Sequence, residues 1–356
     1  MILLKSIIYK LYICLGSIPE KQMFERIEST PAKICLILTA LITGIYALNF
    51  MFFADCYVIG GDGCFTLLSN EAAEGTQAWG NGGPETAFNG LLMLGLTMST
   101  LLMLNEGAKG MWRIMVPVII GTATMTYSVV VNGDFTDANE APKYVVPLVL
   151  VIYSAAYYFL MEEGVNEGIE NWFGGIKVED KMAMVSLVLL VLMGLFYSLR
   201  MIIDPAGVIE DGETALNYMA GADGMGAPSE ATVGVSGSLI LVYTLWAANV
   251  LFEGATGKWA IMHPSAFAWI AVTISTYVGL VAGNVRNISD GNQMDIIAGP
   301  LVMLLVLLSY YRLKDEGMED GMTIMGEPAE GDFFSATALT FALIIGALFA
   351  VSEIFM

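Results

Sequence analysis

The stretch EGAKGMWRIMVP runs from Glu106 to Pro117, and a close copy, EGATGKWAIMHP, runs from Glu253 to Pro264. Eight of the twelve positions are identical, and the two copies lie 147 residues apart. Self-similarity at a long spacing is typical of a chain built from repeated structural units. The pair therefore directs attention to how far the repeat extends and to what the repeated residues do.

Composition indicates that the chain lies in a lipid bilayer. It has 356 residues, of which 56% are hydrophobic and 14% charged, and its mean hydropathy is +0.68. Soluble domains are about 25% charged, and a helix needs about 20 apolar residues to cross a bilayer. We therefore predict an all-α polytopic integral membrane protein, because the strict alternation of a membrane β-barrel is absent from the sequence. The nine expected spans are 32–54, 87–104, 114–131, 144–161, 182–203, 233–252, 265–283, 296–313 and 335–354.

The similarity extends beyond the opening motif. Residues 147–164 match residues 300–317 without a gap at an offset of 153, with eight of eighteen positions identical. Further upstream, GIYALNFMFFAD at 44–55 resembles GLFYSLRMIIDP at 194–205. We therefore predict two tandem copies of a four-helix unit. Because four is even, both copies enter the membrane from the same side, which makes a parallel repeat with a pseudo-two-fold axis along the membrane normal.

The remaining segments flank these two units. Residues 1–18 are apolar but carry Lys5 and Lys10, and they are expected to form an amphipathic helix on the membrane surface, with a tenth span as the alternative. The expected layout is a cytoplasmic N-terminal segment (1–31), the first membrane repeat (32–164), a cytoplasmic linker (165–181), the second membrane repeat (182–317), an acidic cytoplasmic linker (318–334) and a ninth transmembrane helix (335–356).

Basic residues predict the orientation. In the predicted topology twelve of the fifteen Lys and Arg residues lie on one side, only Lys143 and Arg286 lie on the other, and Arg200 lies within a span. The excess of positive charge marks the cytoplasmic side. We therefore expect a protein of the plasma membrane, with its N-terminus in the cytoplasm and its C-terminus outside. The net charge of −20 argues against nucleic acid as a partner.

Every position in the repeated motif has an expected role in the fold. The glycines are expected to end a helix in the left-handed conformation, the tryptophans to anchor at the level of the lipid headgroups, and the prolines to lie in the first turn of the next helix. These features favour a structural hairpin, with a shared binding site as the alternative. The residues are Gly107 and Gly254, Trp112 and Trp259, and Pro117 and Pro264.

Ionisable residues that could carry chemistry are few. Glu106 and Glu253 occupy matching positions at helix ends. They could relay protons or cations, or they could be interfacial carboxylates paired with nearby cations. Arg200 is expected either to pair with Asp204 one turn later or to contact a ligand. His263 is the single histidine, and Val116 occupies its position in the first copy.

Other candidates are weaker. The matched Tyr127 and Tyr277 could line a solute path, and Cys56 and Cys64 in the first outer loop could form a disulfide. The residues indicate no metal site and no particular cofactor.

Two functions are compatible with this pattern. The first is a non-catalytic membrane subunit that binds hydrophobic ligands, such as lipid, pigment or quinone, or partner membrane proteins. The alternative is a transporter or channel for small solutes or cations, with its path between the two repeats. An enzyme is disfavoured because the sequence contains no evident arrangement of nucleophile and base.

Overall fold

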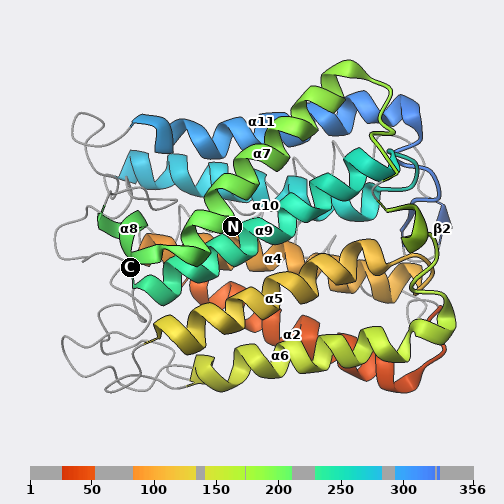
Figure 1. The fold of residues 1–356 in the computed structure, drawn as a ribbon, viewed down its shortest axis with the longest axis horizontal. Helices are drawn as coiled ribbons and strands as arrows, with labels where there is room; N and C mark the ends of the chain where they lie inside the picture. Colours follow the sequence, from red (N-terminus) through yellow and green to blue (C-terminus); the bar gives the residue numbers. More distant parts are fainter. Residues whose placement is uncertain are drawn as a thin grey trace, which may run out of the picture.

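A computed structural model describes residues 26–52, 83–133, 141–172, 174–210, 229–282, 293–324 and 327–328. These residues are almost entirely helical (Figure 1). The α-helices are α2 (Thr30–Phe52), α4 (Gly83–Glu106), α5 (Trp112–Asn132), α6 (Ala141–Phe159), α7 (Lys181–Ile203), α8 (Pro205–Glu210), α9 (Glu230–Glu253), α10 (Trp259–Ala282) and α11 (Gln293–Leu313). Short 3-10 helices cover Met161–Glu163, Ile169–Asn171 and Lys314–Glu316, and the two-residue strands β1 (Thr323–Ile324) and β2 (Glu327–Pro328) pair antiparallel.

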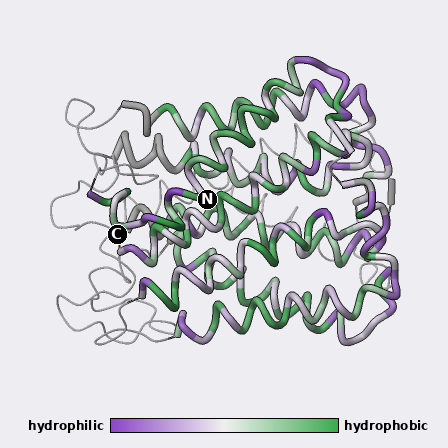
Figure 2. The backbone as a smooth tube through the Cα atoms, in the orientation of Figure 1, coloured by the Kyte–Doolittle hydropathy of each residue, from purple (hydrophilic) through white to green (hydrophobic). Residues whose placement is uncertain are grey.

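Seven of these helices are long and apolar enough to cross a membrane. They are α2, α4, α5, α6, α7, α9 and α11. The described apolar part of α10, Trp259–Ile274, is shorter than a span, although the helix itself continues to Ala282. Figure 2 shows hydrophobic residues along the long helices and hydrophilic residues at the end where short connections join them. The expected surface helix at 1–18 and the expected ninth span at 335–354 lie outside the described residues.

The long helices contact one another in a closed circuit. Its order is α2, α4, α10, α11, α7, α9, α5, α6 and back to α2, and α4 also contacts α9 across the middle. We call residues 26–172 the first half and residues 174–328 the second half. The two halves interlock, because α5 packs mainly on α9 of the second half and α10 packs on α4 of the first (Figure 1).

Burial separates central from peripheral helices. Within their most apolar windows, 78% of the residues of α4 and 83% of those of α9 are buried, against 22% for α6, 28% for α7 and 22% for α11. The peripheral helices expose large apolar side chains such as Val151, Leu192 and Leu304. Since water would not tolerate so much exposed apolar surface, these faces suit lipid.

Glycines allow the closest helix approaches, and they do so at matching places in the two halves. A Cβ atom on Gly90 of α4 would lie 2.8 Å from the carbonyl oxygen of Ala47 on α2. A Cβ atom on Gly237 of α9 would lie 2.9 Å from the carbonyl oxygen of Ser198 on α7. The offset is 147 residues between the two glycines and 151 residues between the two carbonyl neighbours.

Candidate functional site

The repeated motif forms a hairpin at the hydrophilic end of the helices, which we call the polar end (residues 106–112, 159–172, 253–259 and 313–323). Gly107 and Gly254 end α4 and α9 with φ values of +92° and +88°, a conformation that favours glycine. Each hairpin is tied to the end of the fourth helix of its half, because Gly110 N donates to Gly164 O over 2.9 Å. The second half repeats this bond from Gly257 N to Gly317 O, over 2.8 Å.

The tryptophans of the motif are buried by protein and do not face lipid. Trp112 is fully buried, its indole N–H donates to the carbonyl oxygen of Glu167 over 2.9 Å, and its ring packs edge-on against Trp172. Trp259 is only 4% exposed. The expectation of a headgroup anchor was therefore wrong: the chain after the fourth helix folds over each ring and removes it from the interface.

The prolines also differ from expectation, because they lie in the second turn of their helices. Pro117 is the sixth residue of α5 and Pro264 the sixth residue of α10. A proline at this position leaves the carbonyl four residues earlier without its helical donor. For Pro117 that carbonyl belongs to Arg113, and the side-chain amide of Asn249 on α9 donates to it over 2.8 Å. The substitute bond joins the two halves.

Glu106 and Glu253 both lie nearly buried among polar groups. The carboxylate of Glu253, 4% exposed, pairs with Arg113 of the first half and with Lys258 Nζ at 3.2 Å. Burial is the main reason that the pKa of Lys258 lies below its usual value.

The Glu106 carboxylate has a different set of partners. Its side chain is 9% exposed, and it lies 3.5 Å from Arg26 and accepts hydrogen bonds from Asn105 and Thr323. The neighbouring cation in sequence, Lys109, pairs instead with Glu167 at 3.2 Å.

His263 is buried, and its Nε2 lies 2.8 Å from the hydroxyl of Tyr310. Tyr310 in turn donates to the carboxylate of Glu319. In the first half the corresponding pair is Tyr157 donating to Asn166, at an offset of 153 in both partners. The second half therefore holds ionisable groups where the first half holds neutral ones.

Of the remaining candidates, the structure describes the side chains of Arg200 and Tyr127, which lie on different helices. Arg200 lies, partly buried, in the last turn of α7, while Asp204 Oδ1 accepts the N–H of Gly207 over 3.2 Å. Tyr127 is 51% exposed on the outside of α5. Tyr277 belongs to α10 beyond the side chains that are described, and Cys56 and Cys64 lie outside the described residues.

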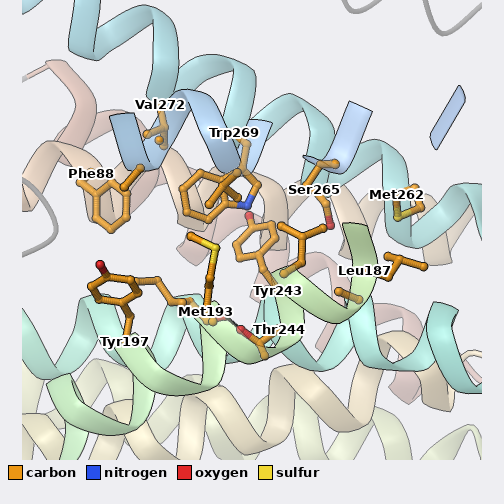
Figure 3. Close-up of a pocket in the computed structure, with 18 of the residues that line it drawn as sticks. Phe88, Leu187, Met193, Tyr197, Tyr243, Thr244, Met262, Ser265, Trp269 and Val272 are labelled. Atoms are coloured by element: carbon orange, nitrogen blue, oxygen red, sulfur yellow. Dashed lines mark hydrogen bonds between the residues drawn. The ribbon is translucent and has the colours of Figure 1, made fainter. Parts of the chain in front are cut away.

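An apolar cavity of about 100 Å³ lies in the second half. Its wall comes from α7, α9, α10 and α11, together with Phe88 of α4. Figure 3 shows the rings of Phe88, Tyr197, Tyr243 and Trp269 around the side chain of Met193. Sequence reasoning did not single out any of these residues, because they come from four helices and form no motif along the chain.

The polar groups of this wall fall into two classes. The hydroxyls of Tyr243, Thr244 and Ser265 donate to backbone carbonyls over 2.6 to 2.9 Å. The hydroxyl of Tyr197 and the indole N–H of Trp269 have no hydrogen-bond partner among the described residues. The wall contains no charged side chain. It thus offers two donors in apolar surroundings.

A smaller cavity of about 40 Å³ occupies the matching place in the first half. Its wall includes Tyr46, Met125 and Val146, which correspond to Tyr197, Val272 and Gly299 of the larger cavity at offsets of 151, 147 and 153. The hydroxyl of Tyr46 is buried without a hydrogen-bond partner. Valine stands at 146 where the second half has glycine at 299, so the smaller cavity has the larger side chain at this position.

Among the described residues there is no group of three or more His, Cys, Asp or Glu side chains that could hold a metal ion. The chain matches no protein-family model, no curated protein and no solved structure. The function is therefore inferred from the geometry of the chain itself.

Proposed function

We propose that this protein is a non-catalytic integral membrane protein that holds a lipophilic molecule of the quinone class in the cavity of its second half. The observation that carries the proposal is the composition of the wall: four aromatic rings, no charge, and two donors without partners. An acceptor that enters these apolar surroundings would gain a hydrogen bond from each donor, and a hydrogen bond contributes about 1 kcal/mol net. A ligand with carbonyl oxygens on an apolar ring would satisfy both Tyr197 and Trp269 while filling the apolar space.

The size of the cavity supports a ring as the buried part. An apolar cavity of about 150 Å³ is known to bind benzene, so about 100 Å³ suits a single ring only if the wall adapts. Met193 lies between the aromatic rings (Figure 3), and methionine is a flexible side chain that fills irregular gaps. We expect Met193 to move when the ring enters and an isoprenoid tail to extend into the bilayer.

The test is a titration of the purified protein with a short-chain benzoquinone, followed by tryptophan fluorescence and by thermal unfolding. We expect saturable quenching at one site per chain, with affinity about fivefold weaker in Tyr197→Phe, since a net hydrogen bond contributes about 1 kcal/mol. Trp269→Phe should lose most of the quenching, whereas Tyr127→Phe, on the exposed face of α5, is the matched control. Absence of saturable binding, or equal binding by Tyr197→Phe and the control, would refute the proposal.

The finer architecture is part of the same proposal: two parallel four-helix repeats, a ninth helix at 335–356, a cytoplasmic N-terminus and a plasma-membrane location. Support for the repeats comes from the matching hydrogen bonds of the two hairpins and from the matching glycine contacts at Gly90 and Gly237. Labelling of single cysteines placed at Lys109 and Lys143 from each side of sealed vesicles tests the orientation, because these positions are expected on opposite faces.

Transport between the two halves is the competing proposal. At the crossing of α4 and α9 the hydroxyl of Tyr243 occupies the space where a side chain on Gly95 would begin, and it donates to the carbonyl oxygen of Leu92 over 2.6 Å. Such tight packing weighs against a path at that crossing. Solute uptake by proteoliposomes that is lost in Glu253→Gln would favour transport over ligand binding.

A further inference from the structure

We propose that Tyr158 and Tyr311 bind the headgroup-level oxygen atoms of phospholipids in the leaflet at the polar end, and that they thereby fix the depth of both halves in the bilayer. The inference concerns an interaction surface with lipid. It does not depend on what occupies the cavity of the second half.

The first line of support is a repeated pair of tyrosines whose two members point in different directions. Tyr157 and Tyr310 turn inward and donate to side chains of the segment that follows each fourth helix. Tyr158 and Tyr311 turn outward and are 69% and 46% exposed. Adjacent residues of a helix do not share a face, so one member of each pair serves the hairpin and the other faces the surroundings of the protein.

The second line of support is a stripe of exposed side chains that ends at the outward tyrosine. The stripe runs along the outer faces of α6 and α11, and four of its positions match between the two halves at an offset of 153. Its matched members are Tyr144, Leu148, Val151 and Tyr158 on α6, and Ile297, Leu301, Leu304 and Tyr311 on α11. Both stripes are aliphatic in the middle, and both end in tyrosine at the polar end.

The third line of support is a change of chemistry at these tyrosines. One turn farther along the chain the exposed residues are acidic, namely Glu162 and Asp315, and hydrophilic residues gather at this end of the helices (Figure 2). The ammonium group of Lys314 also lies 5.6 Å from the ring centre of Tyr311. Aliphatic side chains suit hydrocarbon and carboxylates suit water, so the edge of the bilayer crosses each fourth helix at the tyrosine.

Tyrosine fits such a boundary because its ring is apolar and its hydroxyl is polar. It is one of the two residue types enriched where membrane meets water. The sequence had assigned this role to Trp112 and Trp259, which are buried. The outward tyrosines of the fourth helices supply the same chemistry on a surface that lipid can reach.

The test measures depth in vesicles of phosphatidylcholine. Natural cysteines of the full-length protein are replaced by serine, and a fluorophore is attached to single cysteines at Val151, Glu162, Leu304 or Asp315. Spin labels on the lipid headgroup or deep in the acyl chain then quench the fluorescence. We expect the chain label to quench more at Val151 and Leu304, and the headgroup label to quench more at Glu162 and Asp315. The opposite order at either helix would overturn the proposed boundary.

The anchoring itself is tested by substitution. Tyr158→Leu combined with Tyr311→Leu extends both aliphatic stripes by one turn, so the fluorophore at Asp315 should move toward the chain label by up to about 5 Å. Tyr158→Phe combined with Tyr311→Phe keeps the rings and should give a smaller shift in the same direction. Leu148→Ala combined with Leu301→Ala, on the same faces within the hydrocarbon, is the matched control and should leave the depth unchanged.

Each result has a defined consequence. An unchanged depth in the leucine variant, or an equal shift in the alanine control, would overturn the anchoring role. A shift in the leucine variant with none in the phenylalanine variant would overturn the bonds from the hydroxyls. None of these results depends on benzoquinone binding, so the proposed function stands or falls separately.

Discussion

Gly299→Val is the substitution that tests the cavity most directly, because the first half already has valine at the matching position 146. A Cβ atom on Gly299 would lie 3.6 Å from Cγ1 of Val272, which is an ordinary contact, so a side chain can begin at this position without a clash. Valine at the matching position 146 accompanies a cavity of about 40 Å³ rather than about 100 Å³. We therefore expect the substitution to fill up to about 60 Å³.

Filling this space has a predictable effect on stability. Apolar cavities cost about 24 cal/mol per Å³, so removing 60 Å³ should stabilise the ligand-free protein by up to about 1.4 kcal/mol. Replacing a helical glycine adds a few tenths of a kcal/mol. By contrast, a ligand at one hundred times its dissociation constant stabilises wild type by about 2.7 kcal/mol, and the variant should not gain this stabilisation.

The two effects have opposite signs, so thermal unfolding in detergent separates them. Without ligand the Gly299→Val protein should unfold at a higher temperature than wild type. With saturating benzoquinone the order should reverse, because about 2.7 kcal/mol exceeds about 1.4 kcal/mol. A variant that is less stable without ligand, or that retains the full ligand-induced shift, would contradict the assignment of this cavity as the binding site.

Three further substitutions test contacts at and beside the polar end. Asn249→Leu should destabilise the protein by about 1–3 kcal/mol in chemical unfolding, because the partly buried carbonyl of Arg113 then loses its donor. Unchanged stability would exclude this role. The bond from Arg312 is the main reason that the pKa of Asp180 lies below its usual value of 3.8, so wild-type stability should fall as the pH drops through that lowered pKa, and Asp180→Asn should flatten the fall. Burial is the main reason that the pKa of Lys258 is lowered. Wild-type stability should therefore rise as the pH increases from that lowered pKa to the usual value of 10.5. A rise of equal size in Lys258→Met would refute the assignment.

Hydropathy predicted most of the helices but not their partners. The run at 32–54 corresponds to α2 at Thr30–Phe52, and the run at 233–252 corresponds to α9 at Glu230–Glu253. Helix pairing in lipid depends on close packing and on a few polar bonds rather than on hydropathy. The crossing of α5 onto α9, which Asn249 helps to hold, therefore left no periodic signal.

The residues of the candidate site were hidden for a related reason. A periodic pattern in the sequence can identify residues that share one helix face. The four rings of this wall come from four helices, and they are Phe88, Tyr197, Tyr243 and Trp269. Their common property, a wall around one cavity, exists only after packing. Internal comparison contained a usable signal, because glycine stands at 299 where the first half has valine at 146.

The two halves retain one packing frame but differ where they contain space or charge. The close contacts at Gly90 and Gly237, and the hairpin bonds of the repeated motif, have nearly the same geometry in both halves. If the cavities were accidents of loose packing, the frame around them should differ as well. The halves differ in cavity size and in the trio of His263, Tyr310 and Glu319, and both differences make the second half the better candidate for a specific ligand.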